Sequence, residues 1–181
     1  MSTPTPPVET VTALARRYRL ELDMGTNNAP TWTLVPGVTE FTPKVEPTQQ
    51  DVTTYDAEGW SEQAVTMLAW SVETTIAHRA HPMTGAFNAA QEFLRKASMS
   101  FGAASYVTVR YYDRNGADDA QQGTALVTWE PAGGGPDEVD TVKITLTGSG
   151  PLAPIANPAA DGGASALDSR TKMPKPSGGE A

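Results

Sequence analysis

Apolar and polar residues alternate along several segments of this chain, the pattern of β-strands with one buried face. The first segment is RRYRLELDMG, whose apolar face carries Tyr18, Leu20, Leu22 and Met24. After a turn, TWTLVPGV predicts a second, short strand that ends at Pro36 and Gly37.

The segment AVTMLAWSVETTIAHR, residues 64–79, is long for a single strand, so we expect a bend or a bulge within it. Its expected buried face carries Leu68, Trp70, Val72, Thr74 and Ile76. Three more strands are predicted by SYVTVRYYD, GTALVTWE and DTVKITLTG. The dipeptide Asn115-Gly116 favours a hairpin between the first two of these.

Helical spacing appears in TGAFNAAQEFLRKASMSFG, where the apolar stripe is formed by Phe87, Ala90, Phe93, Leu94 and Ala97. Asn88 and Gln91 have the spacing of a capping box, so the helix is expected to begin at Thr84 or at Asn88. Gly102 can stop the chain from continuing as a helix.

Together these elements predict a mainly β fold: an antiparallel β-sandwich or partly closed barrel with one α-helix, a long inter-strand loop and flexible terminal arms. Residues 1–15, rich in Thr and Pro, are expected to be an N-terminal arm. Residues 16–158 form the folded domain in this interpretation. Residues 159–181, of Gly, Ala, Ser and Pro with scattered charge, are expected to be a disordered C-terminal tail.

The formal net charge of −8 argues against a basic surface for nucleic acid. Most of this negative charge comes from residues 40–73. They contain one base, Lys44, and seven acids: Glu40, Glu46, Asp51, Asp56, Glu58, Glu62 and Glu73. The absence of cysteine excludes disulfides and thiol chemistry. No run of residues is long and apolar enough to cross a bilayer, so we expect a soluble protein without a membrane partner, made in a cytoplasm.

Each candidate chemical motif lacks a residue or an element that its chemistry requires. His78 and His81 lack further metal donors nearby, and the loop around Asp113 has no closing glutamate for calcium. Residues 148–153 match a dinucleotide fingerprint, but the prolines that follow forbid the necessary helix. The acid pair at 118–119 has no supporting feature for glycoside hydrolysis. We therefore expect no catalytic residue, no cofactor and no metal.

The order of several short motifs resembles the major tail tube proteins of long-tailed, non-contractile bacteriophages. The motifs are W-x-L-V-P-G at 32–37, F-x-P at 41–43 and a polar loop closed by Y-D-x-x-G-W at 55–60. A helix after the long strand, a hairpin and the ending LTGSGPLAPIANP are also similar. The likeness runs from Tyr18 to Pro158. Some relatives carry an added immunoglobulin-like domain after this region; here we expect only a Pro/Gly-rich tail after Pro158.

The resemblance implies a structural virion protein that self-assembles into stacked hexameric rings, the tail tube through which DNA passes during ejection without specific binding. It also implies a tape-measure protein, tail tip or initiator proteins and terminator proteins as partners, and assembly in the host cytoplasm before incorporation in the virion tail. An alternative is a carbohydrate-binding β-sandwich module or a phage decoration protein, with Trp32, Trp60 and tyrosines as a platform.

In this resemblance the loop at residues 40–62 reaches neighbouring subunits. It carries too few apolar side chains to offset the backbone entropy lost on ordering, so we expect it to be mobile in the monomer and ordered on assembly. The residues expected at the subunit interface are Phe41, Pro43, Val45, Tyr55 and Trp60.

Overall fold

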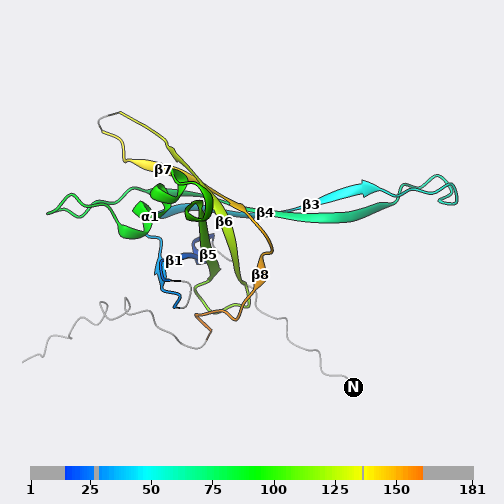
Figure 1. Cartoon of the computed structure of the whole chain (residues 1–181), viewed down its shortest axis with the longest axis horizontal. Coiled ribbons are helices and arrows are strands. Elements are labelled where there is room, and N and C mark those ends of the chain that lie inside the picture. Colours follow the sequence, from blue (N-terminus) through cyan, green and yellow to red (C-terminus); the bar gives the residue numbers. More distant parts are fainter. Residues whose placement is uncertain (1–14, 27–28, 136, 161–181) are drawn as a thin grey trace, which may run out of the picture.

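A computed structural model describes residues 15–26, 29–135 and 137–160, as a strongly curved sheet with one helix and several projecting hairpins (Figure 1). The expected N-terminal arm therefore lies outside the described residues except for Ala15, and the expected C-terminal tail except for residues 159–160. In chain order the elements are η1 (Ala15–Arg17), β1 (Tyr18–Asp23), β2 (Trp32–Leu34), β3 (Val38–Asp51), β4 (Gln63–Ala77), α1 (Ala89–Ser98), η2 (Gly102–Ser105), β5 (Tyr106–Asp113), β6 (Ala120–Pro131), β7 (Thr141–Gly148) and β8 (Ala153–Pro154).

The strands form one antiparallel sheet in the order β2-β1-β5-β6-β7-β4-β3, with β8 added beside β6. The sheet curls so far that Phe41 of β3 contacts Tyr18 of β1, although the two strands lie near opposite ends of that order. It does not close into a barrel. The predicted mainly β, antiparallel fold with one helix is thus confirmed, with β8 as an addition that its two-residue length hid in the sequence.

The core lies on the concave face of the sheet and includes most of the alternating residues predicted to be buried, but the expected burial of Leu68 is wrong, because it is 70% exposed. Leu20 and Leu22 of β1, and Val72 and Ile76 of β4, are at most 1% exposed. The ring of Trp70 packs directly on Gly123 of β6 and Gly148 of β7. A Cβ at these positions would lie only 2.5 and 2.3 Å from the ring. Those positions therefore require glycine for close approach.

Helix α1 begins after Asn88, whose side chain accepts a hydrogen bond from the backbone N–H of Ala90 at 3.0 Å. The other half of the predicted capping box is wrong. Gln91 is fully buried and instead donates to the carbonyls of Pro36 and Ala77, while its Oε1 accepts from the backbone N–H of Arg79. A single amide thus satisfies backbone groups at the ends of β2 and β4 and fixes the helix to the sheet.

The expectation of a long loop over residues 40–62 is wrong for its first half, because β3 runs to Asp51 and pairs with β4 along its whole length. Pro43 and Pro47 fit because β3 is an edge strand. Since they are four residues apart, both nitrogens point to the open side of the strand, where no partner needs an N–H. Only residues 52–62 connect the two strands as a loop.

Candidate subunit interface

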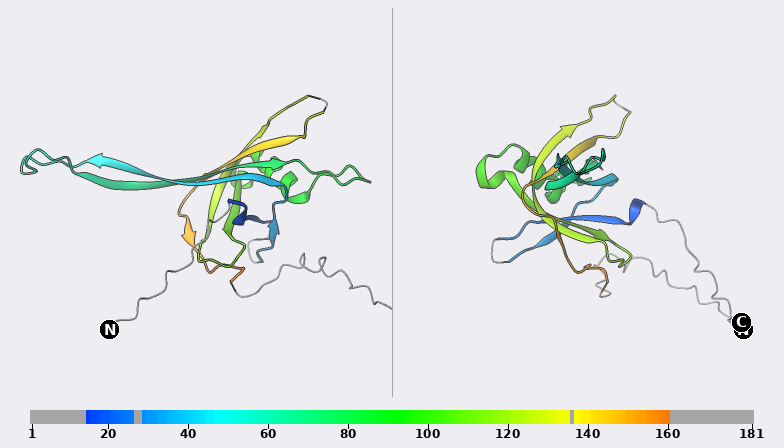
Figure 2. Two further views of the ribbon diagram at one scale, coloured as in Figure 1. Left: turned by 180° about the vertical axis from the view of Figure 1, so that it is seen from behind. Right: turned by 90° about the vertical axis from the view of Figure 1, so that its right-hand side faces the viewer.

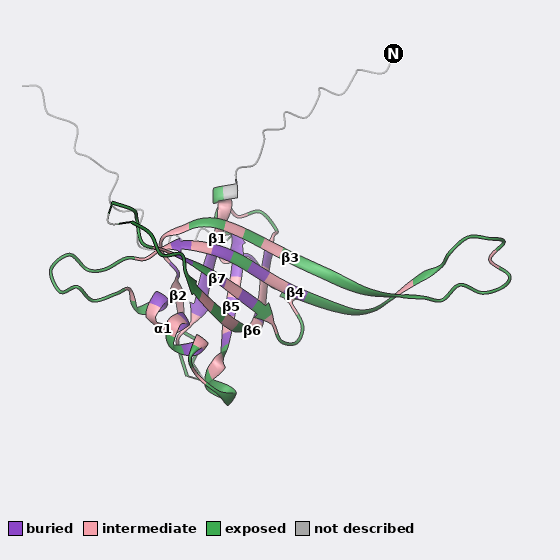
Figure 3. Ribbon diagram, turned by 90° about the horizontal axis from the view of Figure 1, so that it is seen from above, coloured by how far each residue is buried: buried purple, intermediate pink, exposed green. Residues whose placement is uncertain are grey.

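The hairpin formed by β3 and β4 extends well beyond the body of the molecule, and we call residues 45–68 the arm (Figure 2). The half of β4 nearer the body is held between β3 and β7, but residues before Ser71 have no partner in β7. The arm is therefore a two-stranded ladder with both broad faces open, and nearly all of it is exposed (Figure 3).

The arm carries a row of apolar side chains on the face that continues the core. Directly paired residues point to the same face of a ladder, and the pairs here are Val45 with Trp70, and Pro47 with Leu68. A register shift after Thr48 then pairs Gln49 with Val65. This is the bulge predicted in the long strand, and it keeps Val65 on the face of Leu68 instead of the opposite one.

These apolar side chains are open to solvent: Val45 is 52%, Val65 58% and Leu68 70% exposed. Where the arm leaves the body, a cavity of about 640 Å³ adjoins the row, lined by Val45, Leu68, Ala69, Trp70, Gln121, Gly148, Gly150, Pro151, Leu152 and Pro154. Trp70 is held there by a hydrogen bond from its Nε1 to the carbonyl of Gly150 at 3.0 Å. Contiguous exposed apolar side chains make this surface a candidate interaction site.

The loop at the end of the arm is held by its own hydrogen bonds. The N–H of Val52 donates to the carbonyl of Glu62 at 3.0 Å, and the N–H of Glu62 donates to Thr53 Oγ1 at 3.0 Å. Asp51 accepts from the side chain and the backbone of Thr53, which lowers the pKa of its carboxyl group. Tyr55 is fully exposed and Trp60 is 79% exposed, so neither aromatic ring packs against its own chain.

The five residues predicted at the interface divide into two groups. Val45, Tyr55 and Trp60 lie on the arm and are exposed. Phe41 and Pro43 lie at its base, where the ring of Phe41 contacts those of Tyr18 and Tyr111 at 5.2 and 5.5 Å between centroids. Sequence reasoning placed Leu68 on the buried face and made no prediction for Val65 and Met67, and all three are exposed apolar residues of β4.

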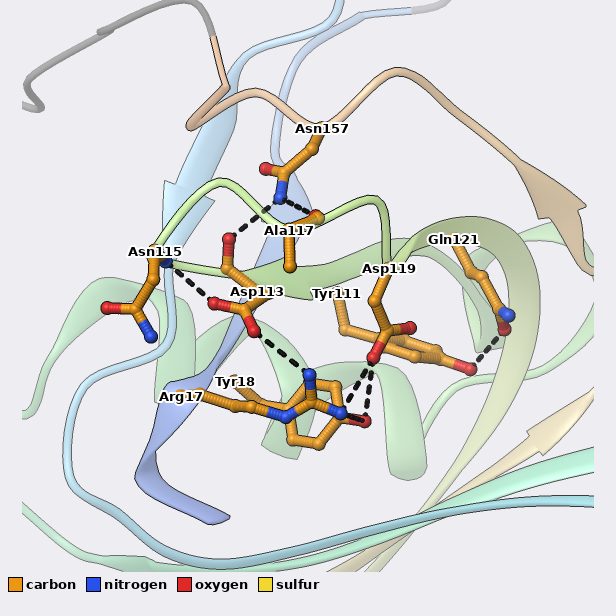
Figure 4. Close-up of polar contacts among 9 residues, drawn as sticks. All are labelled: Arg17, Tyr18, Tyr111, Asp113, Asn115, Ala117, Asp119, Gln121 and Asn157. Atoms are coloured by element: carbon orange, nitrogen blue, oxygen red, sulfur yellow. Dashed lines mark hydrogen bonds and ion pairs between the residues drawn. The ribbon is translucent and has the colours of Figure 1, made fainter. Parts of the chain in front are cut away.

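A cluster of polar side chains joins the two ends of the described chain at the β5–β6 turn (Figure 4). Arg17, just before β1, pairs with Asp113 at 2.9 Å and with Asp119 at 3.0 Å. Asn157, beyond β8, donates to the carbonyls of Asp113 and Ala117. These contacts fix where the chain enters and leaves the body, beside each other.

Two tyrosine hydroxyls extend this polar cluster. The hydroxyl of Tyr18 donates to Asp119 at 2.9 Å. The pKa of Tyr18 is raised mainly by burial and also by this hydrogen bond. The hydroxyl of Tyr111 donates to Gln121, and its burial, with Asp119 nearby, raises the pKa of Tyr111 to about 12. Both phenols therefore remain protonated donors at neutral pH.

The histidines singled out in the sequence serve separate local contacts. His78 stacks on Phe87 at 4.0 Å and its Nδ1 lies 2.8 Å from Asp140, whereas His81 Nδ1 accepts from the N–H of Met83. Within residues 15–26, 29–135 and 137–160, no three His, Cys, Asp or Glu side chains are grouped to hold a metal ion. Over the same residues, no helix is long and apolar enough to span a membrane.

Comparison with solved structures finds similar folds, whereas neither a protein-family model nor a curated protein sequence matches the chain. A chain from the tail of an empty gene transfer agent (GTA) particle, determined with C6 symmetry, matches with a TM-score of 0.60 and 10% identity, over 80% of this chain and all of that one. The SPP1 tail tube matches with a TM-score of 0.56 and 15% identity, over 78% of each chain. The chain has the fold of tail-tube proteins.

A third match comes from the virion of the native gene transfer agent particle, with a TM-score of 0.57, 11% identity and coverage of 78% of this chain and 98% of that one. The shared region thus includes nearly the whole of both particle proteins. The TM-scores of these matches show a common fold, and at identities this low the similarity shows the fold alone.

Proposed function

We propose that this protein is a structural, non-catalytic subunit of a tail tube, and that its copies assemble into hexameric rings that stack end to end. The arm carries the proposal, because it is an ordered hairpin that leaves its own core and exposes an apolar row. A lone soluble domain has no use for such a surface, whereas a neighbouring subunit can cover it. The tail-tube fold and the C6 symmetry of one similar tail favour a copy of the same chain as that neighbour.

Contacts through the side chains of the arm fit this chain better than addition of a strand to its outer edge. The open side of β3 lacks an N–H at both Pro43 and Pro47, so a foreign strand could not continue a regular ladder there. The exposed row of Val45, Val65 and Leu68 is therefore the surface offered to a partner.

The tube built from these subunits conducts DNA without binding it. A net charge of −8 disfavours phosphate contacts, and the convex face of the sheet is rich in threonine. Its lysines are paired with acids, Lys44 with Glu46 and Lys143 with Glu73 at 3.0 Å. In this proposal a tape-measure protein fills the lumen during assembly in the host cytoplasm. Tail tip or initiator proteins and terminator proteins bind the two ends of the tube in the virion.

The alternative of a carbohydrate-binding module or decoration protein requires a shared aromatic platform. Trp32 on β2 is covered by the guanidinium of Arg110 at 4.2 Å, whereas Trp60 lies in the loop that connects β3 and β4 at the end of the arm. Two rings so far apart cannot stack on one sugar chain, so the geometry favours assembly over sugar binding.

The experiment that tests the proposal removes the outer part of the arm, with Val65, Tyr55 and Trp60, and leaves the body unchanged. Residues 49–66 are replaced by Asn-Gly, which connects the register partners Thr48 and Met67 through a two-residue hairpin turn. We expect wild-type protein to form rings or tubes in electron micrographs, alone or with its initiator and tape-measure proteins, and the shortened variant to stay monomeric with an unchanged far-UV spectrum. Normal tubes from the shortened variant would refute the proposal.

A further inference from the structure

An arginine-rimmed cavity lies in the gap between β1 and β3, where the curled sheet fails to close. Its volume is about 820 Å³. Leu20, Leu34, Val35 and Phe41 give it an apolar floor, and Arg16, Arg19 and Arg114 contribute the positive charge. Glu40 is the carboxylate in this lining. We call this cavity the arginine pocket.

Arg16 and Arg114 are exposed and available to an outside anion, whereas Arg19 is half-buried beside Tyr112, its register partner in β5. Within the described part of the chain, no carboxylate lies within salt-bridge distance of Arg16, Arg19 or Arg114, whereas Arg17 next to them is engaged by Asp113 and Asp119. Glu40 forms no ion pair with them and instead accepts a hydrogen bond from the hydroxyl of Thr75 on β4. In a chain with a net charge of −8, this concentration of unpaired arginine is a local exception.

The loop at the end of the arm has the complementary chemistry. Residues 51–62 contain Asp51, Asp56, Glu58 and Glu62 and no basic residue. Beside these acids, Tyr55 and Trp60 stand free in solvent. Exposed aromatic rings flanked by carboxylates match an apolar floor rimmed by arginine, where a guanidinium can both pair with an acid and stack on a ring.

We propose that the acidic, aromatic end of the arm of one copy docks into the arginine pocket of a second copy. The occupant cannot be the same molecule, because the ladder between β3 and β4 directs the arm away from its own body (Figure 2). From Val45 to Asp51 alone the strand advances about 20 Å at roughly 3.3 Å per residue, enough to reach a neighbour. The inference rests on the proposed self-assembly and names the acceptor site for it.

Disulfide trapping tests this contact directly, since the chain contains no cysteine of its own. Ser61→Cys labels the end of the arm and Thr39→Cys labels the pocket lining, and both positions are exposed. The two single variants are mixed at high concentration, oxidised and separated without reductant. We expect a disulfide-linked heterodimer, at least tenfold more than when Ser61→Cys is mixed with Thr128→Cys, an exposed control on the convex face. Equal yields for the two mixtures would overturn the proposal.

Charge reversal then tests the recognition. The pair Asp56→Lys and Glu58→Lys in the arm, or Arg16→Glu and Arg114→Glu in the pocket, is expected to lower the trapped yield about tenfold, and combining the reversed arm with the reversed pocket to restore it. The matched control, Glu130→Lys near the end of β6 combined with Asp137→Lys in the β6–β7 loop, should leave the yield unchanged. Yields insensitive to both reversals overturn the inference.

The two proposals fail in distinguishable ways. Tubes that form normally while no arm–pocket disulfide can be trapped would leave the tail-tube function standing and remove the pocket as acceptor. A trapped heterodimer from a protein that never forms rings or tubes, even with its partner proteins, would support the arm–pocket contact and count against the tube.

Discussion

Replacement of Leu68 by aspartate should separate assembly from folding. Leu68 is 70% exposed in the single chain, so the substitution removes little buried surface and should change the free energy of unfolding by less than about 0.5 kcal/mol. On assembly, covering the remaining leucine surface is worth about 1–2 kcal/mol. An aspartate in its place would also have to be desolvated against apolar side chains, at a cost of about 1–3 kcal/mol or more.

The summed penalty of roughly 2–5 kcal/mol predicts a rise of at least tenfold in the critical concentration for tube formation, since about 1.4 kcal/mol corresponds to a factor of ten. The assay is sedimentation of tubes over a protein concentration series, with thermal denaturation of the monomer alongside. Met67→Asp is the matched control, because Met67 is 66% exposed and adjacent but lies on the opposite face of the arm. Equal effects of the two substitutions on assembly would refute the assignment of the apolar face.

Three further predictions concern the body. Gly148→Ala should destabilise the fold by about 1–3 kcal/mol in urea denaturation, because the added methyl would overlap Trp70. Arg17→Ala should lower stability by about 1–3 kcal/mol, since it leaves the buried Asp113 without its ionic partner; the same urea titration measures it, and an unchanged midpoint would argue against a role for the cluster. Because the folded pKa of Tyr111, about 12, lies above its unfolded value of about 10, its contribution should be present below pH 10 and lost as the pH rises toward 12, and Tyr111→Phe should remove that part of the alkaline transition.

Strands whose one face is buried could be predicted from the sequence because alternation and burial coincide in them. Leu20 and Leu22, like Val107 and Val109, alternate with polar residues, and all four are buried as expected. The helix could be predicted for a similar reason, since Asn88 supplies a local cap. The role of Gln91 could not, because its partners are backbone carbonyls at the ends of β2 and β4, distant in the sequence.

The outer half of β3 was not recognisable because it leaves the core. Apolar alternation runs along β3 through Phe41, Pro43, Val45 and Pro47, but the two prolines and the polar residues between them are typical of a loop. Proline is compatible with an edge strand and incompatible with a central one, and a sequence does not state which strand is the edge. The sequence therefore predicts a flexible segment for all five interface residues, whereas Phe41, Pro43 and Val45 lie on an ordered ladder.

The ordered ladder changes how the arm can contribute to assembly. A disordered segment of this length would lose about 1–2 kcal/mol of backbone entropy per residue on docking, which would offset most of the gain from covering a few apolar side chains. Here the pairing of β3 with β4 has already fixed the backbone of residues 38–51 and 63–77, so this cost is met when the domain folds. Binding of the arm by a neighbour then has to order side chains and the short loop at its end. A small apolar row, Val45, Val65 and Leu68, together with the charges of the loop, can therefore be sufficient to join subunits.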